Sequence, residues 1–121
     1  MKISKFEDIV AWQKARLLNQ VLFKEFGEIR NFTFKDQLFR ASLSINNNIA
    51  EGFERGSNKE LRQFLYIARG STAEVRSMLY IGLDNNYISL RQKTELIALT
   101  EEVGRLLTGF IKTINDRLSK D

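Results

Sequence analysis

Residues 57–82 of the chain read SNKELRQFLYIARGSTAEVRSMLYIG. Apolar or small side chains recur there at alternating intervals of four and three residues, at Leu61, Leu65, Ala68, Thr72, Val75 and Leu79. That spacing fits the 3.6-residue turn of an α-helix, and no segment of the chain keeps the two-residue period of a strand. Ser57 followed by Glu60 forms a capping box, which marks a helix start. We therefore predict a long amphipathic helix over residues 58–85.

Three other segments carry the same apolar period. The apolar positions are Ala11, Ala15, Leu18, Leu22 and Phe26 in the first, Phe34, Leu38, Ala41, Ile45 and Ile49 in the second, and Leu96, Leu99, Val103, Leu106 and Phe110 in the last. Together they predict helices at about 8–26, 34–54 and 90–118.

Capping signals separate these helices. Thr33 with Asp36 and Ser89 with Gln92 are predicted to cap the second and fourth helices. The predicted stops are Gly27, Gly56 and the pair Asn85-Asn86, because glycine and asparagine tolerate the left-handed conformation that ends many helices.

Apolar stripes of this kind must be buried against neighbouring helices, and short connections make successive helices antiparallel. The sequence therefore predicts an all-α fold, an antiparallel up-down-up-down four-helix bundle. A chain of 121 residues has the size of one domain, so residues 1–121 are predicted to form a single bundle domain.

A second set of apolar side chains lies beside the main stripes. It comprises Phe64, Ile67, Met78 and Ile81 in the third helix and Ile97, Leu107, Ile111 and Ile114 in the fourth. These residues fit either a broad core or an interface between subunits. The small residues Gly70, Ala73 and Ser77 point away from the main stripe and would let another helix approach closely.

The composition argues against an enzyme. The chain has no cysteine and no histidine, which removes a thiol nucleophile, the commonest general base and the commonest ligands for zinc. Its acidic residues lack the Glu-x-x-His pairing of di-iron bundles, and the glycines around Phe53 do not form a phosphate loop. We therefore predict no catalytic residues, no cofactor and no metal site.

No apolar run approaches the ~20 residues that span a bilayer, and the N-terminal residues lack the apolar region of a secretory signal. The expected location is the cytoplasm. The net charge is +4, which allows an acidic partner without requiring one.

A row of arginines is the one charge pattern above background. Arg55, Arg62, Arg69 and Arg76 are each seven residues apart, so the last three share one edge of the third helix, and Arg40 and Lys59 are candidates to extend this surface. Guanidinium groups in a row suit the phosphates of nucleic acid, and nearby tyrosines can add stacking. In the alternative interpretation, the arginines cover apolar side chains or pair with glutamates such as Glu60 and Glu74.

The segment SINNNIAEG, residues 44–52, places three asparagines inside a helical period, although asparagine is a poor helix former. Asn48 and Glu51 lie one turn apart, next to Gly52. We interpret them as a hydrogen-bonded structural motif at a helix junction, the alternative being ordinary surface residues.

Three stretches resemble a known family. Residues 6–15, FEDIVAWQKA, are similar to the pattern F-x-D-L-x-V-W-Q-K-A. Residues 40–52, RASLSINNNIAEG, resemble R-A-x-x-S-I-x-x-N-I-A-E-G, and residues 55–74 follow R-x-S-x-x-E-x-x-x-F-L-x-I-A-x-G-S-x-x-E. These patterns identify the four-helix-bundle family of bacterial 23S rRNA intervening-sequence proteins, which is related to the accessory variability determinant of diversity-generating retroelements.

The resemblance spans about residues 6 to 88, and the last helix matches only in general character. The family usually has proline where this chain has Asn46 and a Phe-Pro pair before the second helix, so we expect local changes in helix geometry. The resemblance implies a homo-oligomer, specifically a pentameric ring, and association with structured RNA such as rRNA or with a reverse transcriptase. It implies no enzymatic activity.

Two hypotheses follow. The first is a homo-oligomer that binds nucleic acid without sequence specificity through its basic surface. The second is a scaffold or accessory subunit that binds a protein partner and does not touch nucleic acid.

Overall fold

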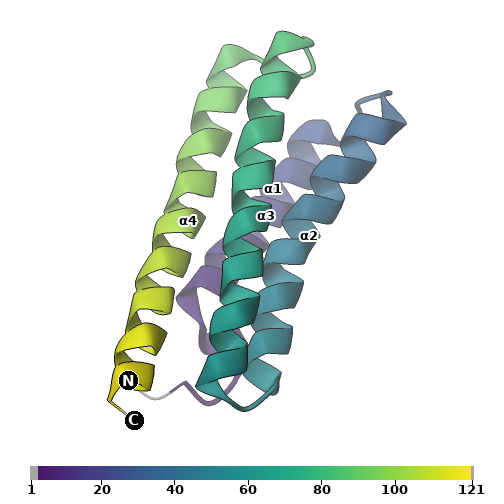
Figure 1. Ribbon diagram of the computed structural model, residues 1–121. Coiled ribbons are helices and arrows are strands. Elements are labelled where there is room, and N and C mark those ends of the chain that lie inside the picture. The colour runs from purple at the N-terminus through teal and green to yellow at the C-terminus, as the bar shows by residue number, and fades with distance from the viewer. Residues whose placement is uncertain (1–2, 121) are drawn as a thin grey trace.

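The structure is a computed structural model that describes residues 3–120. A short 3-10 helix, η1 (Phe6–Asp8), precedes four α-helices: α1 (Val10–Phe26), α2 (Phe32–Glu54), α3 (Asn58–Asp84) and α4 (Leu90–Ser119). Each helix packs side by side with its two neighbours, α1 and α3 each lying against both α2 and α4 (Figure 1). The predicted all-α four-helix bundle is confirmed, and every helix begins and ends within two residues of its predicted bounds. The largest difference at the N-terminus is that η1 and Ile9 precede α1, which was predicted to begin at residue 8.

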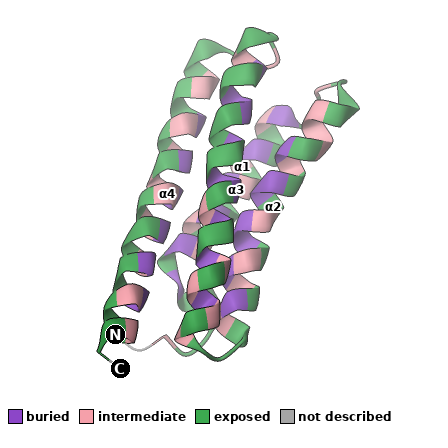
Figure 2. Ribbon diagram, viewed as in Figure 1, coloured by how far each residue is buried: buried purple, intermediate pink, exposed green. Residues whose placement is uncertain are grey.

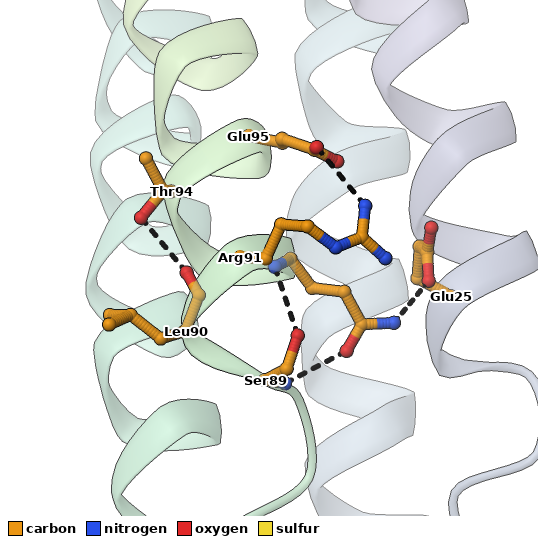
Figure 3. A network of polar contacts seen from close by, with 7 residues as sticks. Glu25, Ser89, Leu90, Arg91, Thr94 and Glu95 are labelled. Carbon is orange, nitrogen blue, oxygen red and sulfur yellow. Dashed lines mark hydrogen bonds and ion pairs between the residues drawn. The ribbon is translucent and has the colours of Figure 1, made fainter.

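The predicted helix starts are confirmed at two of three places. The Ser57 side chain accepts from the Glu60 backbone N–H, but the predicted box is only half formed, because the Glu60 carboxylate accepts from the Ser57 hydroxyl and not from its backbone N–H. Ser89 forms a full capping box with Gln92, which also donates to Glu25 on α1 (Figure 3). The prediction for Thr33 is wrong. Asn31 caps α2 instead, its Oδ1 accepting from the Phe34 N–H at 3.0 Å, so Thr33 lies inside the first turn.

The helix ends are also partly as predicted. Gly56 and Asn86 have φ of 82° and 60°, the left-handed conformation expected after a helix. Gly27 was expected to adopt it as well, but its φ is −58°. Its N–H still donates to the Phe23 carbonyl at 2.9 Å, so the right-handed turn simply continues through this residue.

The core lies between the four helices, as the burial colours show (Figure 2). All the predicted stripe positions of α1 and α3 are buried, and so are those of α2 except Phe34, which is partly buried. In α4 the predicted Leu96 and Val103 are buried, but the rest of the buried stripe is made by Thr100, Leu107, Ile111 and Ile114. Leu99, Leu106 and Phe110, which were predicted for the seam, are only partly buried.

Thr100 explains why part of the α4 prediction was wrong. Its side chain is fully buried because its hydroxyl donates to the Leu96 carbonyl of its own helix at 2.7 Å. A threonine whose hydroxyl is satisfied in this way presents only its methyl group to the core, so it can occupy a position that sequence patterns reserve for apolar residues.

The second apolar set divides between the two interpretations. Met78, Leu107, Ile111 and Ile114 are buried in the core, as a broad core requires. Ile67 and Ile81 instead remain 49% and 45% exposed on α3, with Tyr66 and Tyr80 beside them. Gly70, Ala73 and Ser77 are exposed on the same helix. We call the two isoleucines, the two tyrosines, Gly70 and Ser77 the α3 outer strip; Ala73 is left out because it lies on the side of α3 toward α4.

The α2–α3 junction depends on Gly52. This glycine is buried, and a Cβ added there would lie 2.6 Å from the Cβ of Phe64, which is too close for two carbon atoms. Because the Phe64 Cβ is next to the backbone, it cannot swing aside. Gly52 therefore lets the two helices approach closely.

Replacing Gly52 with alanine should destabilise the protein by roughly 1–3 kcal/mol, because α2 and α3 must move apart to accept the methyl group. Urea denaturation measures the free energy of unfolding. Gly109→Ala is the matched control: nothing lies within 4 Å of a Cβ there, so the better helix propensity of alanine should leave the stability unchanged or raised. Equal stability of the Gly52→Ala variant and the parent would contradict this packing.

A buried polar network joins α1 to α2. The Asn46 side-chain amide donates to the Trp12 carbonyl at 3.0 Å, and its Oδ1 accepts from the Asn19 amide at 2.6 Å. The Ser42 hydroxyl in turn donates to the Asn19 Oδ1 at 2.9 Å. Asn46 thus has partners for its carbonyl and amide, which explains how it is tolerated at 8% exposure inside a helix.

Candidate nucleic-acid interface

The arginine row lies along the edge of α3 that faces α4. Arg62 donates to the Asn115 Oδ1 of α4 at 2.9 Å, and Arg69 and Arg76 line a groove between the two helices. The opposite edge of α3 faces α2, where the Ser71 and Ser44 hydroxyls lie 2.9 Å apart. The seven-residue spacing therefore places three guanidinium groups along the α3–α4 boundary.

The groove has a volume of about 400 Å³. Arg69 and Arg76 line it from α3, and Arg105 and Glu101 line it from α4. The remaining lining residues are small: Thr72, Ala73, Thr100, Gly104 and Thr108. Three cationic side chains and one carboxylate give the groove a formal charge of +2, half of the net charge of the whole chain.

Arg105 was missed by the sequence analysis. It does not belong to the seven-residue row, and nothing within α4 marks it. The signal becomes visible only when α4 is paired with α3 in antiparallel register, because Arg62 opposite Asn115 places Arg105 beside Thr72 and Ala73.

The other predicted residues lie elsewhere. Arg55 caps α2, pairs with Glu51 at 3.1 Å and Glu60 at 3.7 Å, and sits over the Phe64 ring. Its ion pair with Glu60 agrees with the alternative interpretation, in which the arginines pair with glutamates and do not bind phosphates.

Arg40 pairs with Asp36 at 2.9 Å on α2, so it does not extend the α3–α4 boundary. Lys59 is exposed in the first turn of α3. The exposed ion pairs of Arg40 and Arg55 contribute little stability, but each carboxylate lowers the positive potential around its arginine.

Asn48 and Glu51 do not bond to each other. Asn48 donates to the Ser44 carbonyl at 2.8 Å and to the Ser44 hydroxyl at 2.9 Å, and that hydroxyl contacts Ser71 of α3. Glu51 accepts from Arg55. The hydrogen bond that joins α2 to α3 here is therefore made by Ser44, whose hydroxyl is held in place by Asn48.

Within residues 3–120, no group of three or more acidic side chains is placed to hold a metal ion. The described helices likewise include none that is long and apolar enough to cross a membrane.

Comparison with known proteins agrees with this architecture. A crystal structure of a protein of unknown function from the S23 ribosomal protein family of Bacteroides thetaiotaomicron is similar, with a TM-score of 0.80. The two sequences are 23% identical, and the match covers 85% of this chain and 96% of the other. None of the curated proteins matches this chain.

The family model described as 23S rRNA-intervening sequence protein matches residues 7–109. That range includes all but the first residue of η1, all of α1, α2 and α3, and the first two-thirds of α4, and with it the whole α3–α4 groove. This protein therefore belongs to the 23S rRNA-intervening sequence protein family.

Proposed function

We propose that this protein is a non-enzymatic homo-oligomer that binds nucleic acid, in the first instance structured RNA, through the basic α3–α4 boundary. The observation that carries the proposal is the row of Arg62, Arg69 and Arg76 along one edge of a single helix. Guanidinium groups bind phosphates through bidentate hydrogen bonds, and such contacts carry no sequence information. The family's name, 23S rRNA-intervening sequence protein, supports RNA as the nucleic acid and the cytoplasm as the location.

The proposed homo-oligomer uses the α3 outer strip as its subunit contact. Four of its side chains, Tyr66, Ile67, Tyr80 and Ile81, are between 44% and 49% exposed, and the small residues between them leave room for a second helix. The resemblance noted above suggests a pentameric ring. A ring would repeat the arginine row in every subunit and so raise the positive potential around the assembly.

The proposed lack of enzymatic activity is supported by the composition. Nucleophilic and acid–base catalysis most often use cysteine or histidine, and this chain has neither.

Two measurements on the purified protein test the proposal. Light scattering at micromolar concentration should give a mass several times 14.1 kDa. Fluorescence anisotropy with a labelled RNA hairpin should show binding that weakens steeply with salt, the log–log slope being roughly −0.7 to −0.9 per phosphate neutralised. Hairpins of unrelated sequence should bind equally well. A monomer would contradict the assembly, and an absence of RNA binding at low salt would contradict the function.

The second candidate function is a protein scaffold or accessory subunit, for example for a reverse transcriptase. The exposed apolar side chains of the α3 outer strip favour it, because patches of this kind mark protein contacts. The two functions differ in salt-sensitive retention on RNA, which only the first predicts.

A further inference from the structure

The α3–α4 groove exists because five of its lining residues are small. Gly104 leaves the groove open because it has no side chain: within 4 Å of a Cβ built there lies only the Thr72 methyl carbon, at 3.8 Å. Bundle helices usually fill such a boundary with larger side chains. Here the space between the helices is left open at the middle of α4.

The floor of the groove offers few hydrogen-bond donors. The Thr72 hydroxyl donates to the Ala68 carbonyl at 2.9 Å, and the Thr100 hydroxyl donates to Leu96. Since both hydroxyls are engaged within their own helices, Thr72 turns its methyl group toward Gly104. The floor is therefore largely apolar, whereas the polar groups stand at the sides.

The charged groups at the sides are arginines that keep their charge available. In the described part of the chain, no carboxylate lies within ion-pair distance of Arg69, Arg76 or Arg105, whereas Arg40 and Arg91 each pair with one carboxylate and Arg55 pairs with two. Glu101 also lines the groove and offsets part of this charge. Arg69 lies over the Tyr66 ring at 5.0 Å, an arrangement that holds its guanidinium plane without neutralising it.

An apolar floor between cationic sides fits a ligand with both characters. A sugar–phosphate backbone has them, because the carbon face of the ribose can rest on the floor while the phosphate meets the guanidinium groups. An inorganic anion alone would leave the floor unused. We propose that the α3–α4 groove is a seat for the ribose-phosphate backbone of a nucleic-acid strand, with Arg69, Arg76 and Arg105 binding the phosphate. This inference rests on the proposed function and assigns it a site.

Filling the groove tests the inference without removing a charge. In Gly104→Leu the new side chain occupies the open space, and leucine is a better helix former than glycine, so the fold should be kept. Gly109→Leu is the matched control on the same helix, since nothing lies within 4 Å of a Cβ there and Gly109 does not line the groove.

The expected result for Gly104→Leu is RNA-hairpin affinity roughly six- to fortyfold below that of the parent at about 0.1 M salt, equivalent to one or two lost phosphate contacts. The control should stay within about twofold. Circular dichroism and light scattering on the same samples check helicity and mass. If Gly104→Leu is folded and binds RNA as the parent does, the groove is not the site, although the proposed function stands.

A second measurement separates failure of the groove from failure of the function. Ribose 5-phosphate and inorganic pyrophosphate are titrated separately into isotope-labelled parent protein, and the Gly104 amide signal is followed by NMR. A shift with ribose 5-phosphate that is lost in Arg76→Gln/Arg105→Gln supports the seat even if the hairpin does not bind. A shift with pyrophosphate alone, or with neither compound, overturns it.

Discussion

The triple variant Arg62→Gln/Arg69→Gln/Arg76→Gln should bind structured RNA roughly a hundredfold more weakly than the parent at about 0.1 M salt. Each neutralised phosphate contributes about 0.7–0.9 to the slope of log affinity against log salt concentration. Two or three phosphate contacts therefore raise the affinity by about a hundredfold when the salt concentration falls from 1 M to 0.1 M, and the variant loses this gain. The salt dependence should become shallower by about two units for the same reason. Anisotropy titrations at several salt concentrations measure both quantities.

The matched control is Arg40→Gln/Arg55→Gln/Arg91→Gln. It removes the same number of charges, but from arginines that each pair with a carboxylate on the same helix. If the α3 edge is the contact surface, this control should lose far less affinity than the α3 variant. Equal losses in the two triple variants would mean that net charge, and not the α3 edge, determines binding.

The α3 variant should remain folded. All three side chains lie outside the buried stripe of α3. The variant loses the hydrogen bond from the Arg62 guanidinium to Asn115, but a glutamine amide is also a hydrogen-bond donor. Helicity and mass measured on the same sample decide this. A variant that unfolds or dissociates would show that the arginines hold helices or subunits together, and its loss of binding would then be secondary.

The sequence predicted the four helices well because several local signals agree. At the start of α3, the apolar spacing, the Ser57 cap and the left-handed Gly56 before it all indicate the same first residue. Where one signal competed with another, the prediction was less accurate. Asn31 and Thr33 are both good capping residues. In the bundle Asn31 caps α2, and its side-chain amide also donates to the Tyr87 hydroxyl at 2.8 Å.

Polar residues account for most of the other errors. Thr100 and Asn46 look like surface residues in a sequence pattern, yet both are buried because hydrogen bonds satisfy them. In Thr100 the partner is four residues away in the same helix, which a pattern could anticipate. In Asn46 the partners are Trp12 and Asn19 of another helix, so the tertiary arrangement must be known first.

The candidate site shows the same limit. The α3 arginines were visible as a seven-residue repeat within one helix. Arg105 and the small residues around Gly104 became part of the site only through the register of α3 against α4. A groove between two helices is a property of the pair, so neither sequence segment alone could predict it.

The largest expected loss of stability is that of Phe26→Ala, about 3–5 kcal/mol. Phe26 is fully buried at the end of α1, its ring centroid 6.0 Å from that of Phe34 on α2. On the other side, its ring lies 3.5 Å from where a Cβ would stand at Gly82 of α3. Truncation therefore leaves a cavity where three helices meet, and the helix backbones prevent the surroundings from collapsing into it.

Phe32→Ala is the control for this prediction, because Phe32 is 72% exposed in the first turn of α2 and its loss should change the stability by less than about 0.5 kcal/mol. Both variants and the parent are compared by urea denaturation at one protein concentration, since assembly would make the stability concentration-dependent. A loss below about 1 kcal/mol in Phe26→Ala would mean that the cavity closes. The helix ends would then be more loosely packed than the contacts of Phe26 indicate, because only movable neighbours can fill the space left by a phenyl ring.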